Sequence, residues 1–311
     1  MPKIRPAYID AFKCSKLAKK STIAQKMLTD CRLCPRECRV NRLNGEAGLC
    51  QTSRDAVVAS YQAHFGEEAP LVGQDGSGTI FFSHCNLLCN FCQNYNISHE
   101  GAGQPVDATQ LAWMMLQLQK AGCHNINFVT PSHVVPQILA ALEIAIPQGL
   151  SVPLIYNSSG YDRVKTLRLL DGIFDIYMPD FKFWDTEVAR KICAAPDYPR
   201  VARRAILEMQ RQVGGLKMGA SGLATRGLLI RHLVLPRGLA GTREVADFVA
   251  CKISKATYVN IMGQYRPHGK AGAIRELSKP LTDEEFKAAV AAAIGEGLTR
   301  LDQLQRIFMM I

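Results

Sequence analysis

The chain has 311 residues, of which 48% are hydrophobic and 21% are charged, a composition typical of a folded soluble enzyme. No apolar run reaches the roughly 18 to 20 residues that a membrane-spanning helix needs, so we expect no membrane partner. The formal net charge is +10, but residues 1–56 hold 12 Lys or Arg against 5 Asp or Glu. Because no aromatic interleaving or recognised binding motif accompanies these charges, we expect no nucleic-acid partner.

Residues 1–30 form a basic N-terminal extension, which we interpret as solvated. Its lysines and arginines interrupt the apolar core that a signal peptide requires. The eleven cysteines of the chain therefore indicate metal ligation in a reducing cytoplasm, where disulfides are rare.

Residues 31–56 predict a small metal-binding knuckle. Four cysteines follow the pattern Cys-x2-Cys-x3-Cys-x11-Cys, and the segment has too little apolar content to hold its shape without a metal. Four thiolates satisfy either a structural zinc ion or a fully ligated 4Fe–4S cluster, and the spacing leaves both open. The predicted ligands are Cys31, Cys34, Cys38 and Cys50.

Residues 57–311 alternate short apolar runs with longer amphipathic ones, which predicts parallel strands covered by helices. The expected strands are Thr79–Ser83, Asn125–Val129, Val152–Tyr156, Phe174–Met178, Leu228–Leu235 and Tyr258–Met262. The expected helices are Ala108–Ala121, Val134–Ile146, Val164–Leu170, Arg200–Val213, Arg243–Ser254 and Asp283–Glu296. This order predicts the α/β class and a partial TIM-type (β/α)6 barrel, whose active site would lie at the carboxyl ends of the strands.

Polar clusters follow several of the predicted strands. Thr130–His133 follows the second, Asn157–Tyr161 the third, Asp180–Lys182 the fourth and Gln264–Arg266 the last. Any one of these clusters alone would be interpreted as a turn or a helix cap. Their shared position favours one common pocket.

Three cysteines come directly after the first predicted strand, with the spacing Cys-x3-Cys-x2-Cys. They are Cys85, Cys89 and Cys92. Zinc sites usually pair cysteines two to four residues apart and add a matching second pair. Three thiolates on one tight loop instead suit three corners of a 4Fe–4S cubane, which normally takes four ligands. One iron is then left free to bind a substrate or cofactor.

With Phe91 before the third cysteine, this stretch resembles the signature of the radical S-adenosylmethionine (SAM) superfamily. More narrowly, the chain resembles the pyruvate formate-lyase activating-enzyme-like branch, among members with an N-terminal cysteine knuckle. The similarity covers about residues 31–303. Its strongest strings are residues 31–38, 64–68, 76–94, 127–131, 157–161, 178–182 and 264–267.

The resemblance implies a site-differentiated 4Fe–4S cluster and SAM as cofactors, with the knuckle as a second centre, either an auxiliary 4Fe–4S cluster or zinc. SAM would chelate the open iron, and reductive cleavage would usually give methionine and a 5′-deoxyadenosyl radical. The implied SAM-binding residues are Phe91, Thr130, Ser132, Asn157, Ser158, Asp180, Lys182 and Arg231. The resemblance names no catalytic residue.

Two positions in this implied shell carry alternatives. The branch usually places a carboxylate at the SAM amine after the second strand, whereas Thr130 and Ser132 offer only uncharged acceptors. On the fifth strand, either Arg231 or His232 faces inward, because neighbours on a strand point to opposite sides.

The favoured function is a radical SAM enzyme that acts on a small molecule or peptide and takes its electron from a donor such as flavodoxin or ferredoxin. One alternative is an activase that installs a glycyl radical on a partner enzyme. Transfer of the 3-amino-3-carboxypropyl group of SAM is another. The remaining hypothesis is a non-catalytic protein that binds metal or nucleic acid.

Overall fold

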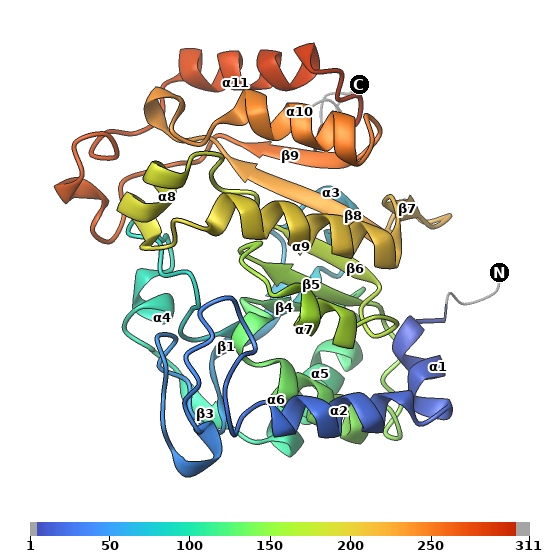
Figure 1. Cartoon of the computed structure of the whole chain (residues 1–311). Coiled ribbons are helices and arrows are strands. Elements are labelled where there is room, and N and C mark those ends of the chain that lie inside the picture. The colour runs from blue at the N-terminus through green and yellow to red at the C-terminus, as the bar shows by residue number, and fades with distance from the viewer. Residues whose placement is uncertain (1–4, 303–311) are drawn as a thin grey trace.

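Six parallel strands form a curved sheet at the centre of the molecule in the computed structural model, which describes residues 5–302 (Figure 1). They follow one another in the order β2, β4, β5, β6, β8 and β9. The bounds are β2 Ser77–Phe82, β4 Ile126–Val129, β5 Leu154–Ser158, β6 Ile176–Pro179, β8 Ala224–Leu233 and β9 Tyr258–Met262. Each predicted strand overlaps one of them, and the predicted α/β partial barrel is confirmed.

Three further strands were not predicted. The antiparallel strand β1 (Ala56–His64) pairs with β2, and β3 (Gln104–Val106) pairs with β1. The short β7 (Lys217–Met218) pairs with β8. Only two residues of β1 are buried, so it lacks the continuous apolar run by which the central strands were recognised.

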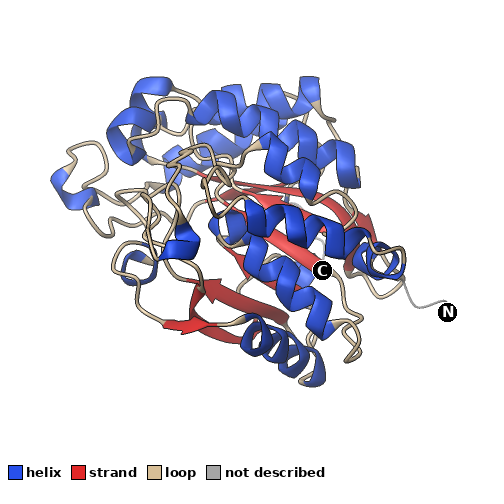
Figure 2. Ribbon diagram, turned by 60° about the horizontal axis from the view of Figure 1, so that its bottom comes forward, coloured by secondary structure: helices blue, strands red, loops and turns tan. Residues whose placement is uncertain are grey.

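Helices cover the outer face of the sheet (Figure 2). Six of them match the predicted ones: α5 Ala108–Lys120, α6 Val135–Ala145, α7 Val164–Leu169, α9 Tyr198–Val213, α10 Thr242–Lys252 and α11 Asp283–Gly295. Asp107 and Gln110 form the predicted capping box at the start of α5, satisfying two backbone N–H groups of the first turn. The remaining α-helices within the barrel are α3 Ala69–Val72, α4 Tyr95–Ser98 and α8 Thr186–Cys193. Within residues 5–302, the 3-10 helices are η1 Arg42–Asn44, η2 Pro131–His133, η3 Pro236–Gly238 and η4 Ala271–Ala273.

The N-terminal segment differs from the solvated extension that we expected. It forms α1 (Ala7–Lys13) and α2 (Lys16–Lys26), and α2 lies along α6 (Figure 1). Tyr8 is fully buried, and its hydroxyl donates to the carbonyl oxygen of Val152 over 2.9 Å. A few apolar side chains among the lysines thus suffice to dock these helices on the barrel.

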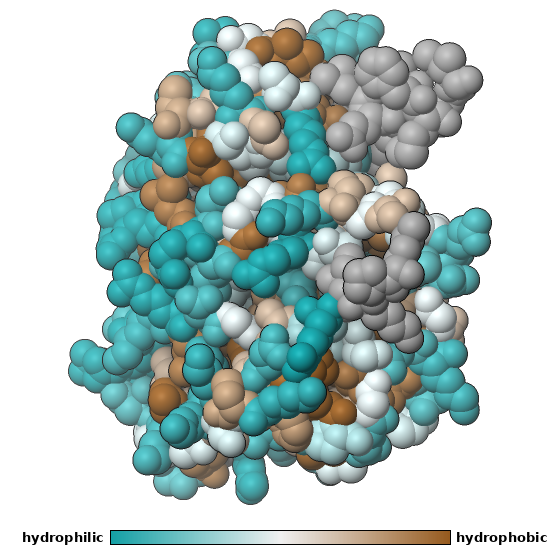
Figure 3. Space-filling view, turned by 90° about the vertical axis from the view of Figure 1, so that its right-hand side faces the viewer, coloured by the Kyte–Doolittle hydropathy of each residue, from teal (hydrophilic) through white to brown (hydrophobic). Residues whose placement is uncertain are grey.

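The core lies on both faces of the parallel sheet. Ile80, Phe128 and Tyr177 on one face, and Ile155, Ile176 and Met178 on the other, are completely inaccessible to solvent. On the face drawn in Figure 3, hydrophobic residues are scattered among hydrophilic ones. Within residues 5–302, no helix has the length and apolar character needed to cross a membrane. The final residues of the predicted barrel domain, 303–311, lie outside the described part of the chain.

Candidate active site

The carboxyl ends of the parallel strands surround a cavity of about 380 Å³. The loop after β2 contributes one wall, and residues at the ends of β4, β5, β6, β8 and β9 contribute the others. This is the edge at which TIM-type barrels carry their active sites, as the polar clusters of the sequence predicted.

The three cysteines of the loop after β2 all line this cavity. The loop turns sharply at His84 and Leu88, which both adopt positive φ values, 68° and 57°. The turn also brings the backbone N–H of Leu87 to 3.3 Å from the Sγ of Cys85. A hydrogen bond of this kind favours a thiolate, the form of cysteine that binds metals.

Burial sets the protonation of the metal-free thiols. It raises the pKa of Cys85 to about 12, although the Leu87 and Leu88 amides oppose the shift. Burial also raises the pKa of Cys92, against a hydrogen bond from Ser98. The thiols are therefore protonated at neutral pH unless a metal takes the place of the proton, because a metal-bound thiol is deprotonated outright.

The donor set fits a cluster whose irons are bound separately. Each thiolate ligand of a cubane cluster binds a different iron atom, so the three sulfurs need not converge on one point. Cys85 and Cys92 each interact electrostatically with Cys89, so the three thiols form one connected set.

A fourth cysteine, Cys193 at the end of α8, contacts this set. Its thiol hydrogen-bonds to Cys89, and this contact together with burial raises the pKa of Cys89. Cys193 is itself buried. The sequence does not mark Cys193 as part of this site, because it lies about one hundred residues after the triad and belongs to no motif.

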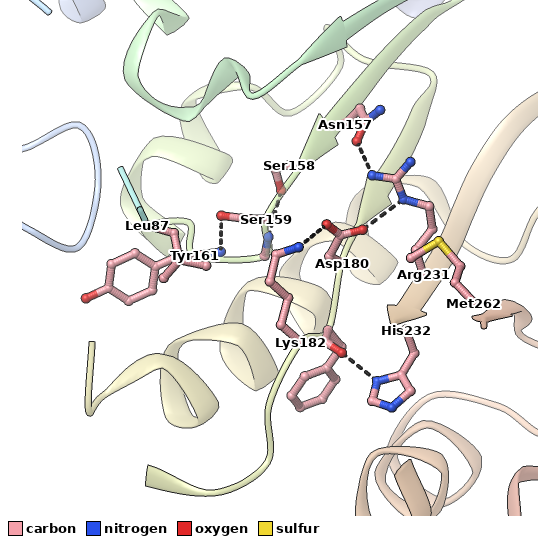
Figure 4. Close-up of polar contacts among 12 residues, drawn as sticks. Leu87, Asn157, Ser158, Ser159, Tyr161, Asp180, Lys182, Arg231, His232 and Met262 are labelled. Atoms are coloured by element: carbon pink, nitrogen blue, oxygen red, sulfur yellow. Dashed lines mark hydrogen bonds and ion pairs between the residues drawn. The ribbon is translucent and has the colours of Figure 1, made fainter. Parts of the chain in front are cut away.

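Beside the triad, Asp180 is held between two cations (Figure 4). Its Oδ2 lies 2.6 Å from the Nζ of Lys182, and its Oδ1 lies 2.8 Å from the Nε of Arg231. Arg231 also donates from Nη2 to the Oδ1 of Asn157 over 2.8 Å. One network thus joins the ends of β5, β6 and β8, and all four of these predicted residues line the cavity.

The charges of this network fix the ionisation of Asp180. Burial acts to raise its pKa, but the positive charges of Arg231 and Lys182 outweigh burial, and the pKa falls below its ordinary value. Asp180 is therefore a carboxylate at neutral pH. Lys182 also interacts with Cys89, which places a cation next to the thiols.

A second carboxylate, Glu67, lines the cavity from the loop after β1. Its Oε2 lies 3.5 Å from the Nη1 of Arg231, and its Oε1 lies 3.5 Å from the Nδ1 of His64. Both contacts are long for charged partners. The neighbouring Glu68 is turned away from this cavity and accepts a hydrogen bond from Asn260.

Arg231, and not His232, faces the cavity. The ring of His232 is fully buried, with Nδ1 2.6 Å from the carbonyl oxygen of Phe181 and Nε2 2.9 Å from the Thr242 hydroxyl (Figure 4). Burial lowers the pKa of His232 to about 4. It is a neutral structural residue behind the site.

The structure does not bring Ser132 to the cavity with the other predicted residues. Its hydroxyl donates to Asp162 over 2.6 Å, and Ser158 and Tyr156 also donate to that carboxylate. Burial raises the pKa of Asp162, although the three hydroxyls oppose this shift. Asp162 thereby orders the ends of β4 and β5, while Ser158 additionally lines the cavity.

The other two predicted residues, Thr130 and Phe91, lie in the cavity wall. Thr130 takes a left-handed conformation with a φ of 62°, and its backbone N–H donates to the carbonyl oxygen of Asn157. Phe91 is 4% exposed and packs edge-on against Phe183 and Tyr265. Its ring is part of the core at the border of the cavity.

The four knuckle cysteines line a second, much smaller hollow of about 10 Å³. Cys31, Cys34 and Cys50 are buried, and Cys38 is exposed. Burial raises the pKa of Cys34 to about 12, with a further contribution from the other three cysteines. A Cβ added to Gly48 would lie 2.7 Å from the Sγ of Cys38, so the loop needs glycine to close over the sulfur.

Arg36, between two of these cysteines, ties the knuckle to the active-site loop. It donates to the carbonyl oxygens of Asn86 and Leu87 on the loop, and to those of Cys193 and Ala194 at the end of α8. Its guanidinium also lies 5.2 Å from the ring centre of Tyr161. The sequence marks this arginine only by its place within the knuckle motif.

These features define a partial (β/α)6 barrel protein with a cysteine-lined cavity at the carboxyl ends of its strands and a cysteine knuckle docked beside it. The chain belongs to the family of the uncharacterized protein MJ0674 of Methanocaldococcus jannaschii. The two are 30% identical over 281 residues, which cover 88% of this chain and 77% of that protein. No protein-family model matches the chain.

Two solved structures are also similar: native anSMEcpe with bound AdoMet, and the same protein with AdoMet and the Cp18Cys peptide. Their TM-scores are 0.45 and 0.46, at 12% and 11% identity, and each match covers 70% of this chain. The matches cover 61% and 60% of the anSMEcpe chains, so this chain spans about three fifths of their length.

Proposed function

We propose that the protein is a radical SAM enzyme that binds a 4Fe–4S cluster through Cys85, Cys89 and Cys92 and holds SAM in the same cavity. One observation carries the proposal: three thiols and a charged polar network from three strand ends line a single cavity of about 380 Å³. That volume is in the range of sites for small molecules and cofactors, about 300 to 1,000 Å³.

The cysteine loop suits a cluster with one open iron, because it supplies three thiolates to a group that takes four ligands. When bound and reduced, such a cluster supplies an electron to SAM at the open iron. Lys182 would offset part of the negative charge of the cluster, since it interacts with Cys89 and is held by Asp180.

The surrounding residues offer complementary groups for the charged and polar parts of SAM. Arg231 offers a guanidinium fork for the carboxylate of the methionyl group, and Asn157 and Ser158 offer polar contacts for that carboxylate or the ribose. The backbone around Phe91 would border adenine. Thr130 supplies an uncharged acceptor for the methionyl ammonium. We add Glu67 as its carboxylate partner, because its contacts in the cavity are long.

The knuckle is proposed as a second metal centre, either an auxiliary 4Fe–4S cluster or zinc. Its four cysteines line one hollow and interact electrostatically. All eleven cysteines of the chain are free, which supports a reducing location such as the cytoplasm.

The proposed substrate is a small molecule or a peptide, and the proposed electron donor is a flavodoxin or ferredoxin. A glycyl radical enzyme as partner and transfer of the 3-amino-3-carboxypropyl group stay as alternatives. These functions predict different products from SAM.

The test is anaerobic reconstitution with iron and sulfide, reduction, and incubation with SAM. A radical SAM enzyme yields 5′-deoxyadenosine and methionine, whereas aminocarboxypropyl transfer yields methylthioadenosine. The Cys89→Ala variant should yield neither, and Cys251→Ala, which alters an exposed thiol on α10, should match the parent. The absence of any SAM-derived product under several reductants would overturn the proposal.

A further inference from the structure

Arg42 is a buried cation that makes no ion pair with a carboxylate in the described part of the chain. Its side chain is 1% exposed, within η1 of the knuckle. Nε donates to the carbonyl oxygen of Ser53 and Nη1 to that of His133, both over 2.7 Å. Nη2 is buried and has no hydrogen-bond partner among residues 5–302. Two neutral carbonyls are therefore its hydrogen-bond acceptors.

A guanidinium in this position is energetically costly. Taking a charge out of water costs several kcal/mol even after the protein relaxes, and neutral carbonyl groups recover only part of that. The cost is offset where a negative charge lies beside the cation.

The cysteine hollow is the place where that charge can form. Arg42 lines it together with all four knuckle cysteines. Four thiolates around Zn²⁺ carry a total charge of −2, and so do four thiolates around an oxidised 4Fe–4S cluster. Both metal centres that the knuckle could hold are dianions.

We propose that Arg42 is the charge partner of a dianionic metal–thiolate centre in the knuckle. The inference rests on the proposed knuckle site but does not depend on which metal fills it. Arg42 would stabilise the loaded centre, and with iron it would also make reduction easier, because hydrogen bonds and positive charge at the sulfurs raise the reduction potential of such clusters.

Arg42 also connects this centre with the active-site loop. The carbonyl oxygen of His133 accepts from Arg42, and the ring Nε2 of the same residue donates to the carbonyl oxygen of Ser83 over 3.0 Å. Burial lowers the pKa of His133 to about 3, so its ring is neutral. Ser83 lies two residues before Cys85. A continuous hydrogen-bonded chain therefore runs from the knuckle to the start of the cysteine loop.

The test uses the full chain with Cys85, Cys89 and Cys92 replaced by alanine, so that the knuckle is the remaining proposed centre. In this background Arg42→Gln and Arg42→Met remove the charge, and Arg42→Lys retains it. Arg39→Met is the matched control, because it removes an exposed arginine next to Cys38. Iron and zinc are counted after anaerobic loading, and the rate of metal loss to a chelator is then measured.

We expect both neutral variants to lose metal about tenfold faster than the parent, or more. Arg42→Lys should lose metal at a rate between those of the neutral variants and the parent, and Arg39→Met should equal the parent. If iron is the metal, the knuckle cluster should also have a lower reduction potential in Arg42→Gln than in Arg42→Lys. A neutral variant that folds and retains metal like the parent would overturn the role of Arg42. If the chain that lacks the three triad cysteines binds neither iron nor zinc, the proposed knuckle site is refuted. That result would not affect the proposal of SAM cleavage, which is tested separately by its products.

Discussion

At the scale of single residues, Arg231 holds the polar side of the cavity together. It contacts Asp180, Asn157 and Glu67, which come from three different segments of the chain. A lysine in its place keeps a charge but has no planar fork to bridge these groups.

We therefore predict that Arg231→Lys retains the iron of the cysteine triad but weakens SAM binding about tenfold or more, the effect of losing one or two charge-assisted hydrogen bonds. Equilibrium SAM binding and iron content measure the two effects separately. Arg226→Lys is the control, because it changes an arginine on the same strand that lies outside the cavity and donates to Gln212. Unchanged SAM affinity in Arg231→Lys would contradict the role of this residue.

Residues such as Cys85, Cys89 and Cys92 were predictable from sequence because the spacing of a short loop determines their proximity. Cys193 was not, since it reaches the site from a distant segment through the packing of α8. Glu67 lies in one of the strings that carry the resemblance, residues 64–68, but its contact with Arg231 depends on the path of the chain after β1. Ser132 was predicted to lie in the site but does not line the cavity. It follows β4 as predicted, but it comes after the left-handed turn at Thr130, and its hydroxyl donates to Asp162.

At the scale of elements, the knuckle supports the active-site loop through Arg36. The four carbonyl groups that accept from this side chain belong to the loop and to the end of α8. Because one side chain joins these four carbonyl groups, removing Arg36 would loosen the loop and the end of α8 together.

We predict that Arg36→Met loses triad iron several-fold faster than the parent during an anaerobic chelator challenge, followed by visible absorbance. Hydrogen exchange at Leu87 and Leu88 should quicken in the same variant. Arg32→Met provides the comparison, because that side chain lies in the same segment and pairs with Asp30 at the surface. Equal iron retention in both variants would show that the knuckle does not support the loop.

The central strands and the six helices that match the predicted ones were predictable because burial on both faces gives a strand a continuous apolar run, and burial on one face gives a helix its periodicity. Strand β1 is half exposed and pairs antiparallel with β2, so neither pattern marks it. The docking of α1 and α2 was missed for a related reason, because their buried face is narrow among many lysines.

At the scale of the whole molecule, Asp175 links the N-terminus to the barrel. It accepts from the backbone N–H of Ala7 over 2.8 Å and from that of Leu154 over 3.0 Å. Burial raises its pKa to about 6, although these two hydrogen bonds oppose the shift. The folded protein therefore holds this proton more tightly than the unfolded chain, in which the pKa of Asp is about 3.9.

It follows that the contribution of Asp175 to stability increases as the pH falls from above 6 toward about 4, by a total of about 3 kcal/mol. We predict that the thermal unfolding midpoint of the parent rises relative to that of Asp175→Asn when the pH is lowered from 7.5 to 5.5. A difference that stays constant with pH would contradict the raised pKa.

The sequence by itself determined the barrel class, the two cysteine groups and most of the polar residues at the strand ends. These features depend on local spacing and on the alternation of apolar runs, which one chain displays directly. Tertiary structure alone decided that Arg231 and not His232 faces the cavity, that Glu67 and Cys193 join the site, and that Arg36 and Arg42 connect the knuckle to it. Such contacts arise where segments far apart in sequence pack together, and no local pattern encodes them.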